Sequence, residues 1–257
     1  MNEILLDREG FVATITINRP EQRNAMTWAM YRRLVEICDE LDQDPQIRVA
    51  IIRGSGGKAF VAGTDISQFR EFHGNPQAGI DYEQRIDGVI DRLERVRKPV
   101  IAAIEGYCVG GGMVIAAACD IRIAATNARF SVPTVRLGNC LSMNNYARLI
   151  ALVGAARARE MVYTGRMVDA REALTAGLVH EVAEPERLGA RVSELAGEIA
   201  AAAPLTVQVS KEAIRRLSGM QHTGTGDDLV ATCYNSRDFQ EGVAAFLEKR
   251  RPEWKGE

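Results

Sequence analysis

The sequence predicts an α/β fold in which units of two strands and a helix recur, instead of a parallel doubly wound sheet. Apolar runs at 47–53 and 100–104 indicate two buried strands, and a glycine-rich turn follows each of them. Helical patterns come after both turns, so strands and helices alternate along the chain. The 257 residues suffice for one large domain or for a domain with an appendage.

The N-terminal elements are indicated by side-chain periodicity. Residues 4–7 and 11–18 flank a Glu-Gly turn and alternate between apolar and polar positions, which predicts a β-hairpin. Thr27 is a suitable N-cap for a helix that runs to about Asp42, with one apolar stripe along it.

The later elements follow in a regular order. A charged helix is expected over 82–97, before Pro99 stops it, and Asp169 is a suitable cap for a short helix. A further strand is expected at 120–124, and a strand and a turn are expected within 130–138. Helices are expected at 143–163 (two of them), 185–202, 204–218 and 227–248.

Composition argues against several classes of protein. The formal net charge of −2 does not suggest a nucleic-acid-binding surface. No apolar run approaches the ~20 residues of a membrane span, and the first residues do not resemble a signal peptide. We therefore expect a cytoplasmic protein. The five cysteines and three histidines lack ligand spacing, so no metal site is expected.

The two glycine-rich turns are the strongest functional signal. Gly110, Gly111 and Gly112 precede an apolar helix, and a second turn spans 54–66. Bare backbone N–H groups at a helix N-terminus can hold an anion or a developing oxyanion. The alternative is that these glycines only permit tight turns. A dinucleotide fingerprint at 54–59 is disfavoured because no helix follows it directly, so we expect no tight NAD(P) binding.

Several short sequence segments, taken together, resemble those of a known family. The chain resembles the crotonase (enoyl-CoA hydratase/isomerase) superfamily along essentially its whole length. The matching words are Asn18-Arg-Pro-Glu-Gln-Arg-Asn-Ala25, Ala59-Phe-Val-Ala-Gly-Thr-Asp-Ile66, Lys98-Pro-Val-Ile-Ala-Ala-Ile-Glu-Gly106, Gly110-Gly-Gly112, Ala118-Cys-Asp-Ile-Arg-Ile-Ala124, Glu160-Met-Val-Tyr-Thr-Gly165, Ala173-Leu-Thr-Ala-Gly-Leu-Val179 and Glu241-Gly-Val-Ala-Ala-Phe-Leu-Glu-Lys-Arg250.

The resemblance implies a crotonase-like spiral of ββα units over 1–195 that carries an acyl-CoA site. It also implies a helical C-terminal region, 196–257, that forms homotrimers or dimers of trimers. Coenzyme A would enter as part of the substrate, with no separate cofactor.

Individual site residues are implied in the same way. The backbone N–H groups of Thr64 and Gly111 would be the oxyanion donors of the catalytic site. Lys249 would reach a phosphate, or else be an ordinary solvated lysine. The residues expected around the nucleotide and pantetheine are Arg23, Ala25, Ala62, Asp65 and Ile66.

The expected acid and base are missing from their usual places. Family hydratases carry glutamates where this chain has Val114 and Thr134, and some isomerases and dehalogenases carry an acid where it has Ser142. A standard two-glutamate mechanism is therefore disfavoured. The residues expected to line the acyl pocket are Asp87, Val114, Thr134, Ser142 and Asn144.

Two functional hypotheses remain open from the sequence. The first is an enzyme that stabilises a thioester enolate and moves protons with non-standard groups. The second is a non-catalytic acyl-CoA-binding subunit on the same fold. Asp81 and Glu83 are carboxylates near the site, but the pattern around them is that of a solvated helix face.

Overall fold

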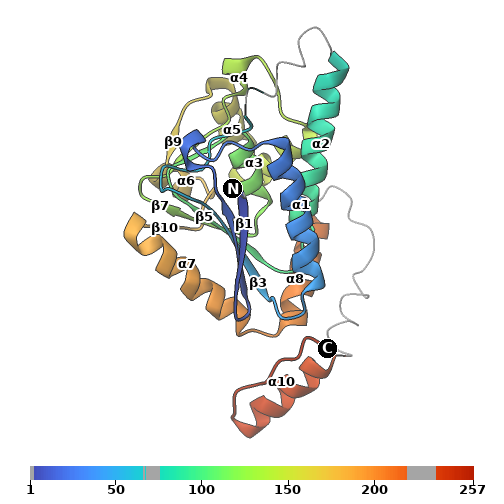
Figure 1. Cartoon of the computed structure of the whole chain (residues 1–257). Coiled ribbons are helices and arrows are strands. Elements are labelled where there is room, and N and C mark those ends of the chain that lie inside the picture. Colours follow the sequence, from blue (N-terminus) through green and yellow to red (C-terminus); the bar gives the residue numbers. More distant parts are fainter. Residues whose placement is uncertain (1–2, 66, 68–75, 219–235) are drawn as a thin grey trace.

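In the computed structural model, which describes residues 3–65, 67, 76–218 and 236–257, the strands form two sheets (Figure 1). The larger sheet has the order β1-β2-β3-β5-β7-β10, and the smaller has the order β4-β6-β8-β9. The strands of the larger sheet are β1 (Ile4–Glu9), β2 (Val12–Ile17), β3 (Val49–Gly54), β5 (Val100–Ile104), β7 (Ile121–Ala125) and β10 (Glu181–Ala183). Those of the smaller are β4 (Ala59–Val61), β6 (Tyr107–Val109), β8 (Arg129–Ser131) and β9 (Val168–Asp169).

The helices complete repeated strand–strand–helix units. β3 and β4 lead into α2, β5 and β6 into α3, and β7 and β8 into α4. In each unit the first strand joins the larger sheet and the second joins the smaller, which confirms the predicted α/β fold of recurring ββα units. The helices are η1 (Pro20–Gln22), α1 (Trp28–Gln43), α2 (Pro76–Glu94), α3 (Gly111–Ala118), α4 (Thr134–Leu137), α5 (Met143–Thr164), α6 (Ala170–Thr175), α7 (Pro185–Ala200), α8 (Pro204–Ser218) and α10 (Arg237–Glu248).

Local signals in the sequence account for several element boundaries. β1 and β2 pair antiparallel as the predicted hairpin, and Gly10 turns between them at φ 55°. The Thr27 hydroxyl accepts a hydrogen bond from the Met30 N–H at 3.3 Å, so Thr27 caps α1 as expected. Asp169 caps α6 in the same way. Gly154, at φ 72°, separates the two helical halves of α5 that the sequence predicts.

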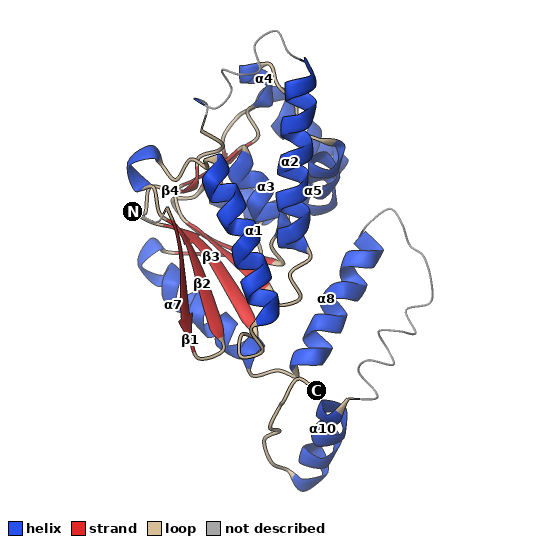
Figure 2. Cartoon of the chain, turned by 45° about the vertical axis from the view of Figure 1, so that its right-hand side comes forward, coloured by secondary structure: helices blue, strands red, loops and turns tan. Residues whose placement is uncertain are grey.

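The central strands of the larger sheet are buried on both faces. Along β3, Val49 and Ile51 face α7, whereas Ala50 and Ile52 face the main core. This alternation follows the period of two along a strand. Figure 2 shows α7 on one side of the fan of strands and α1 and α2 on the other.

Short elements are where the structure departs from the predictions. β4 and β6 are strands of three residues inside the glycine-rich segments, and they pair in parallel with each other. Residues 134–137 form a short helix where a strand and a turn were expected, and α2 begins at residue 76, before the predicted 82. Three residues give too little periodicity to reveal a strand.

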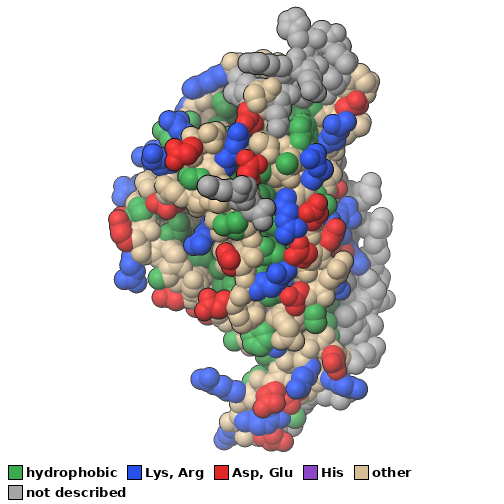
Figure 3. Space-filling model, in the orientation of Figure 1, with side chains coloured by type: hydrophobic (Ala, Val, Ile, Leu, Met, Phe, Trp, Pro, Cys, Tyr) green, Lys and Arg blue, Asp and Glu red, His purple; other side chains and the backbone are tan. Residues whose placement is uncertain are grey.

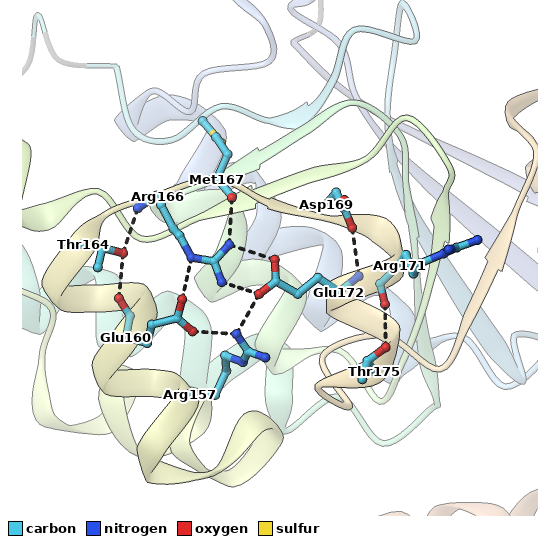
Figure 4. Close-up of polar contacts among 9 residues, drawn as sticks. All are labelled: Arg157, Glu160, Thr164, Arg166, Met167, Asp169, Arg171, Glu172 and Thr175. Atoms are coloured by element: carbon cyan, nitrogen blue, oxygen red, sulfur yellow. Dashed lines mark hydrogen bonds and ion pairs between the residues drawn. The ribbon is translucent and has the colours of Figure 1, made fainter.

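An ion-pair network joins α5 to α6 (Figure 4). Arg157 contacts Glu160 at 2.6 Å and Glu172 at 2.7 Å, and Arg166 also bonds both glutamates. Arg166 holds the pKa of Glu160 and that of Glu172 below the usual value. These contacts fix the short α6 against the end of α5.

The surface mixes charges of both signs. Figure 3 shows Lys and Arg interspersed with Asp and Glu over the visible face. In the described part of the chain, no helix combines the length and the apolar composition that crossing a bilayer requires.

Candidate functional site

The two glycine-rich segments meet where α3 begins. A Cβ atom on Gly110 would lie 3.9 Å from the Cα of Gly63, so the two turns face each other. A Cβ on Gly112 would lie only 2.1 Å from the carbonyl oxygen of Val61. The first turn of α3 therefore packs directly on the backbone of β4, an approach that only glycine permits.

The N–H groups of Thr64 and Gly111 are brought together at this junction. A Cβ on Gly111 would lie 3.4 Å from the Thr64 nitrogen. Thr64 is fixed by a parallel bridge to Met26, with Met26 N–H donating to Gly63 O and Asp65 N–H donating to Met26 O, both at 2.9 Å. Gly111 opens α3, where amides lack an intrahelical acceptor. Among the described residues, neither of these two N–H groups has a hydrogen-bond acceptor.

A chain of hydroxyl groups lies beside the two amides. The Thr64 Oγ1 atom is 2.9 Å from the Tyr31 hydroxyl and 2.9 Å from the Tyr82 hydroxyl. Burial raises the pKa of Tyr31 well above its usual range and raises the pKa of Tyr82 to about 12. Both phenols therefore stay protonated near neutral pH and can donate hydrogen bonds. The sequence indicated Tyr31 only as part of an apolar stripe.

The residues expected around coenzyme A come from two segments that the fold brings together. Ala62 N–H donates to the Arg23 carbonyl at 3.1 Å, and Arg19 Nη1 donates to the Ala25 carbonyl and to Asp65 Oδ2. Arg19 holds the pKa of Asp65 below its usual value, so this carboxylate is already paired within the fold. Ile66, also expected here, lies outside the described residues.

Two neighbouring side chains in these segments, Arg23 and Asn24, have opposite environments. Arg23 is exposed, and its guanidinium lies 5.3 Å from the centre of the Tyr107 ring. Asn24 is fully buried, and its Nδ2 donates to the carbonyls of Ser55 and Ala59 at 3.0 and 2.7 Å. Asn24 was not singled out from the sequence, although it ties both segments to the turn after β3.

Lys249 lies apart from the other predicted site residues within one chain. It is exposed and follows α10 at φ 56°. Both cartoon views show α10 well separated from α3 (Figures 1 and 2). The expected phosphate contact of Lys249 therefore stays a prediction.

Three of the predicted acyl-pocket residues meet at the start of α5. Asp87 on α2 accepts hydrogen bonds from Ser142 Oγ at 2.5 Å and from Asn144 Nδ2 at 3.1 Å. Val114 on α3 and Thr134 on α4 are both 5% exposed. α3, which carries Val114, and α4, which carries Thr134, each pack against α5.

Glu83 is a half-buried carboxylate in the same region. The Ser142 N–H donates to Glu83 Oε2 at 2.9 Å. Burial, with a smaller contribution from the charge of Asp87, outweighs the opposing hydrogen bond from the Ser142 amide and raises the pKa of Glu83 to about 7. The sequence pattern indicated a solvated helix face here, and burial is the physical reason why Glu83 differs.

Comparisons with known proteins agree on one family. A family model described as enoyl-CoA hydratase/isomerase matches residues 7–257. The chain is 38% identical to a short-chain-enoyl-CoA hydratase of Clostridium acetobutylicum, over 98% of this chain and 97% of that protein. It is 36% identical to an (E)-benzylidenesuccinyl-CoA hydratase of Thauera aromatica, over 98% and 99% of the two chains. A crystal structure of an enoyl-CoA hydratase/carnithine racemase from Magnetospirillum magneticum superposes with a TM-score of 0.94 at 37% identity, covering 100% of this chain and 97% of that one.

Proposed function

This chain belongs to the enoyl-CoA hydratase/isomerase family, and on that basis we propose that it acts on an acyl-CoA thioester whose carbonyl oxygen the N–H groups of Thr64 and Gly111 polarise. The observation that carries the proposal is that Thr64 and Gly111 lie next to each other, with no acceptor for either backbone N–H among the described residues. Preorganised donors of this kind stabilise the charge that develops on the oxygen.

The reaction we propose is the reversible addition of water to a 2-enoyl-CoA. With the thioester carbonyl polarised, the β-carbon becomes electrophilic, and water attack there gives an enolate whose negative oxygen the two N–H groups bind. The names of the similar proteins, a short-chain-enoyl-CoA hydratase and a crotonyl-CoA hydratase among them, support hydration over the other reactions of such an enolate.

The proton-transfer groups in this proposal are non-standard. Val114 has no ionisable group, and the hydroxyls of Thr134 and Ser142 cannot act as free bases near neutral pH. Ser142 is further committed, since its Oγ donates to Asp87 and accepts from the Asn145 N–H. An acid and base must therefore come from another side chain or from ordered water.

The proposal is tested by incubating the purified protein with a panel of 2-enoyl-, 3-enoyl-, 3-hydroxy- and 3-oxoacyl-CoA thioesters. Products are identified by mass spectrometry. We expect 2-enoyl chains to gain the mass of one water. A changed double-bond position, a shortened chain or free coenzyme A would identify isomerisation, C–C cleavage or thioester hydrolysis instead.

A non-catalytic acyl-CoA-binding subunit is the second candidate. The absence of a carboxylate at 114, 134 and 142 favours it. Saturable binding of acyl-CoA with no turnover of any panel member above a heat-inactivated control would support this candidate against the enzyme.

We also propose that the C-terminal helices mediate a homotrimer or a dimer of trimers. Large apolar side chains on α8 and α10 are exposed in the single chain, with Ile214 at 64%, Leu217 at 63% and Phe239 at 43%. Such exposure is typical of an interface. Native mass spectrometry is expected to give a multiple of three chain masses, and a monomer at micromolar concentration would contradict this.

A further inference from the structure

We propose that Glu83 is the acid–base group of this site, taking a proton from water and returning it to the α-carbon of the substrate. This inference rests on the proposed function. It assigns the proton transfer to one carboxyl group on α2. This group stands at a different position from 114, 134 and 142, where this chain lacks a carboxylate.

Glu83 follows in sequence the residue by which α2 contacts the donor junction. The preceding residue, Tyr82, reaches Thr64 Oγ1 at 2.9 Å, and the Thr64 amide is one of the two proposed donors. Burial, and to a smaller extent the charge of Glu83, raises the pKa of both Tyr31 and Tyr82. The Tyr31 hydroxyl in turn would lie 2.6 Å from a Cβ on Gly111.

One oxygen of the Glu83 carboxyl group is held and the other is available. The Ser142 N–H fixes Oε2 at 2.9 Å. Among the described residues, no hydrogen bond to Oε1 is formed. The Ser142 contact therefore orients the group, while Oε1 can meet a water molecule or a substrate atom.

The charges that face Glu83 keep it close to its midpoint at neutral pH. Burial and Asp87, one turn further along α2, favour the protonated form, whereas the Ser142 amide at the start of α5 favours the ionised form. Tyr31 and Tyr82 are neutral, and Arg148 on α5 is paired with Asp91 and Glu94. With a pKa of about 7, both forms of Glu83 are populated, as a group that acts first as base and then as acid requires.

Other carboxylates nearby are already engaged. Asp65 is paired with Arg19 and accepts from Ser67, and Asp87 accepts from Ser142, Asn144 and Asn145. Asp81 accepts from Gln77 at 2.8 Å at an exposed position. Among the described carboxyl groups whose pKa is displaced, only that of Glu83 is raised.

The proposed step is balanced in atoms and charge. The Glu83 carboxylate takes one proton from water as the water oxygen bonds to the β-carbon. The electron pair of the C=C bond moves to form the enolate, which the N–H groups of Thr64 and Gly111 stabilise. The Glu83 carboxylic acid then gives the same proton to the α-carbon, and the carboxylate is regenerated. Dehydration follows the same path in reverse.

The test compares Glu83→Gln with the matched control Asp81→Asn, which removes a carboxylate two positions away on the same helix. Using the best 2-enoyl-CoA of the panel, we expect Glu83→Gln to lower kcat by at least about 10²-fold, the lower end for loss of a general acid–base group, with KM little changed. Asp81→Asn should keep wild-type kcat. In the pH profile of the wild type, kcat should fall as the pH is lowered, with a midpoint near 7, because the carboxylate is the active form. The residual activity of Glu83→Gln should not show this decrease at acid pH.

Folding of the variant is checked by thermal unfolding at two pH values. Because the folded pKa of Glu83 is raised, the wild type loses stability as pH rises through about 7, and glutamine does not. The Tm of Glu83→Gln relative to wild type should therefore be higher at about pH 8.5 than at about pH 5. This check does not depend on activity.

The outcomes separate the two proposals. A wild type that turns over the panel, with a folded Glu83→Gln variant of similar kcat and an unchanged acid limb, would overturn the role of Glu83 and leave the proposed function standing. No turnover by the wild type would overturn both. Loss of kcat and of the acid limb in Glu83→Gln, with Asp81→Asn unaffected, would support Glu83 as the acid–base group.

Discussion

Replacing Gly111 with proline is expected to lower kcat/KM for the best substrate by about 10²–10³-fold, as loss of one oxyanion donor does. Proline has no N–H, and it is tolerated in the first turn of a helix, which is where Gly111 lies. Its Cβ would, however, approach the Tyr31 hydroxyl at 2.6 Å. The comparison is therefore made in a Tyr31→Phe background, which removes that hydroxyl.

The control for this prediction is Gly111→Ala in the same background. Alanine adds the same Cβ but keeps the N–H, so its activity should stay within a few-fold of the Tyr31→Phe single variant. Steady-state kinetics give the ratio, and circular dichroism confirms that each variant is folded. Equal activity of the folded proline and alanine variants would show that the Gly111 amide does not bind the oxyanion.

Replacing Gly112 with alanine is expected to destabilise the protein by about 3 kcal/mol or more, at the upper end of overpacking effects. The new Cβ would lie 2.1 Å from the Val61 carbonyl oxygen and 2.9 Å from the Val61 Cβ. Backbone atoms cannot rotate away, so α3 must withdraw from β4. For a chain of this size Tm should fall by roughly 6–12 °C, and activity should fall too because Gly111 moves with α3.

A second alanine variant serves as the comparison for Gly112. Gly189 lies in the interior of α7, is exposed, and has open space around its Cβ position. Gly189→Ala should raise the unfolding free energy by about 0.5–1 kcal/mol, because alanine is the better helix former. If calorimetry gave the two variants the same Tm, the close packing of α3 on β4 would be contradicted.

Much of the fold could be predicted because local signals and tertiary packing agree. Thr27 caps a helix whose stripe is buried, and alternation in β2 places Ala13, Ile15 and Ile17 in the core. β4 and β6 were not predicted. Each has only three residues, and these are strands because they pair with residues more than forty positions away, as Ala59 does with Tyr107. Long-range pairing of this kind leaves no local pattern.

The candidate site also has parts that could be predicted from the sequence and parts that could not. The donor loops could be predicted because glycine at 110–112 has a direct backbone meaning. Glu83 could not be distinguished from Asp81 and Asp87, since all three are acidic residues on one charged helix. Their contacts in the folded chain separate them: Glu83 accepts only from the Ser142 backbone amide, whereas Asp87 accepts from three side chains at the start of α5 and Asp81 accepts from Gln77. Asn24 could not be identified either, because the carbonyl groups that it bonds, those of Ser55 and Ala59, are distant in the sequence.

The central claim is that the N–H groups of Thr64 and Gly111 stabilise a thioester enolate. The most direct measurement is deuterium uptake at the α-carbon of butyryl-CoA in D₂O, followed by mass spectrometry with the wild type and with the Tyr31→Phe/Gly111→Pro variant. A saturated chain cannot add water, so uptake reports enolate formation alone. We predict saturable uptake with the wild type and only background uptake with the variant. Saturable binding of butyryl-CoA to the wild type without any deuterium uptake would contradict the claim.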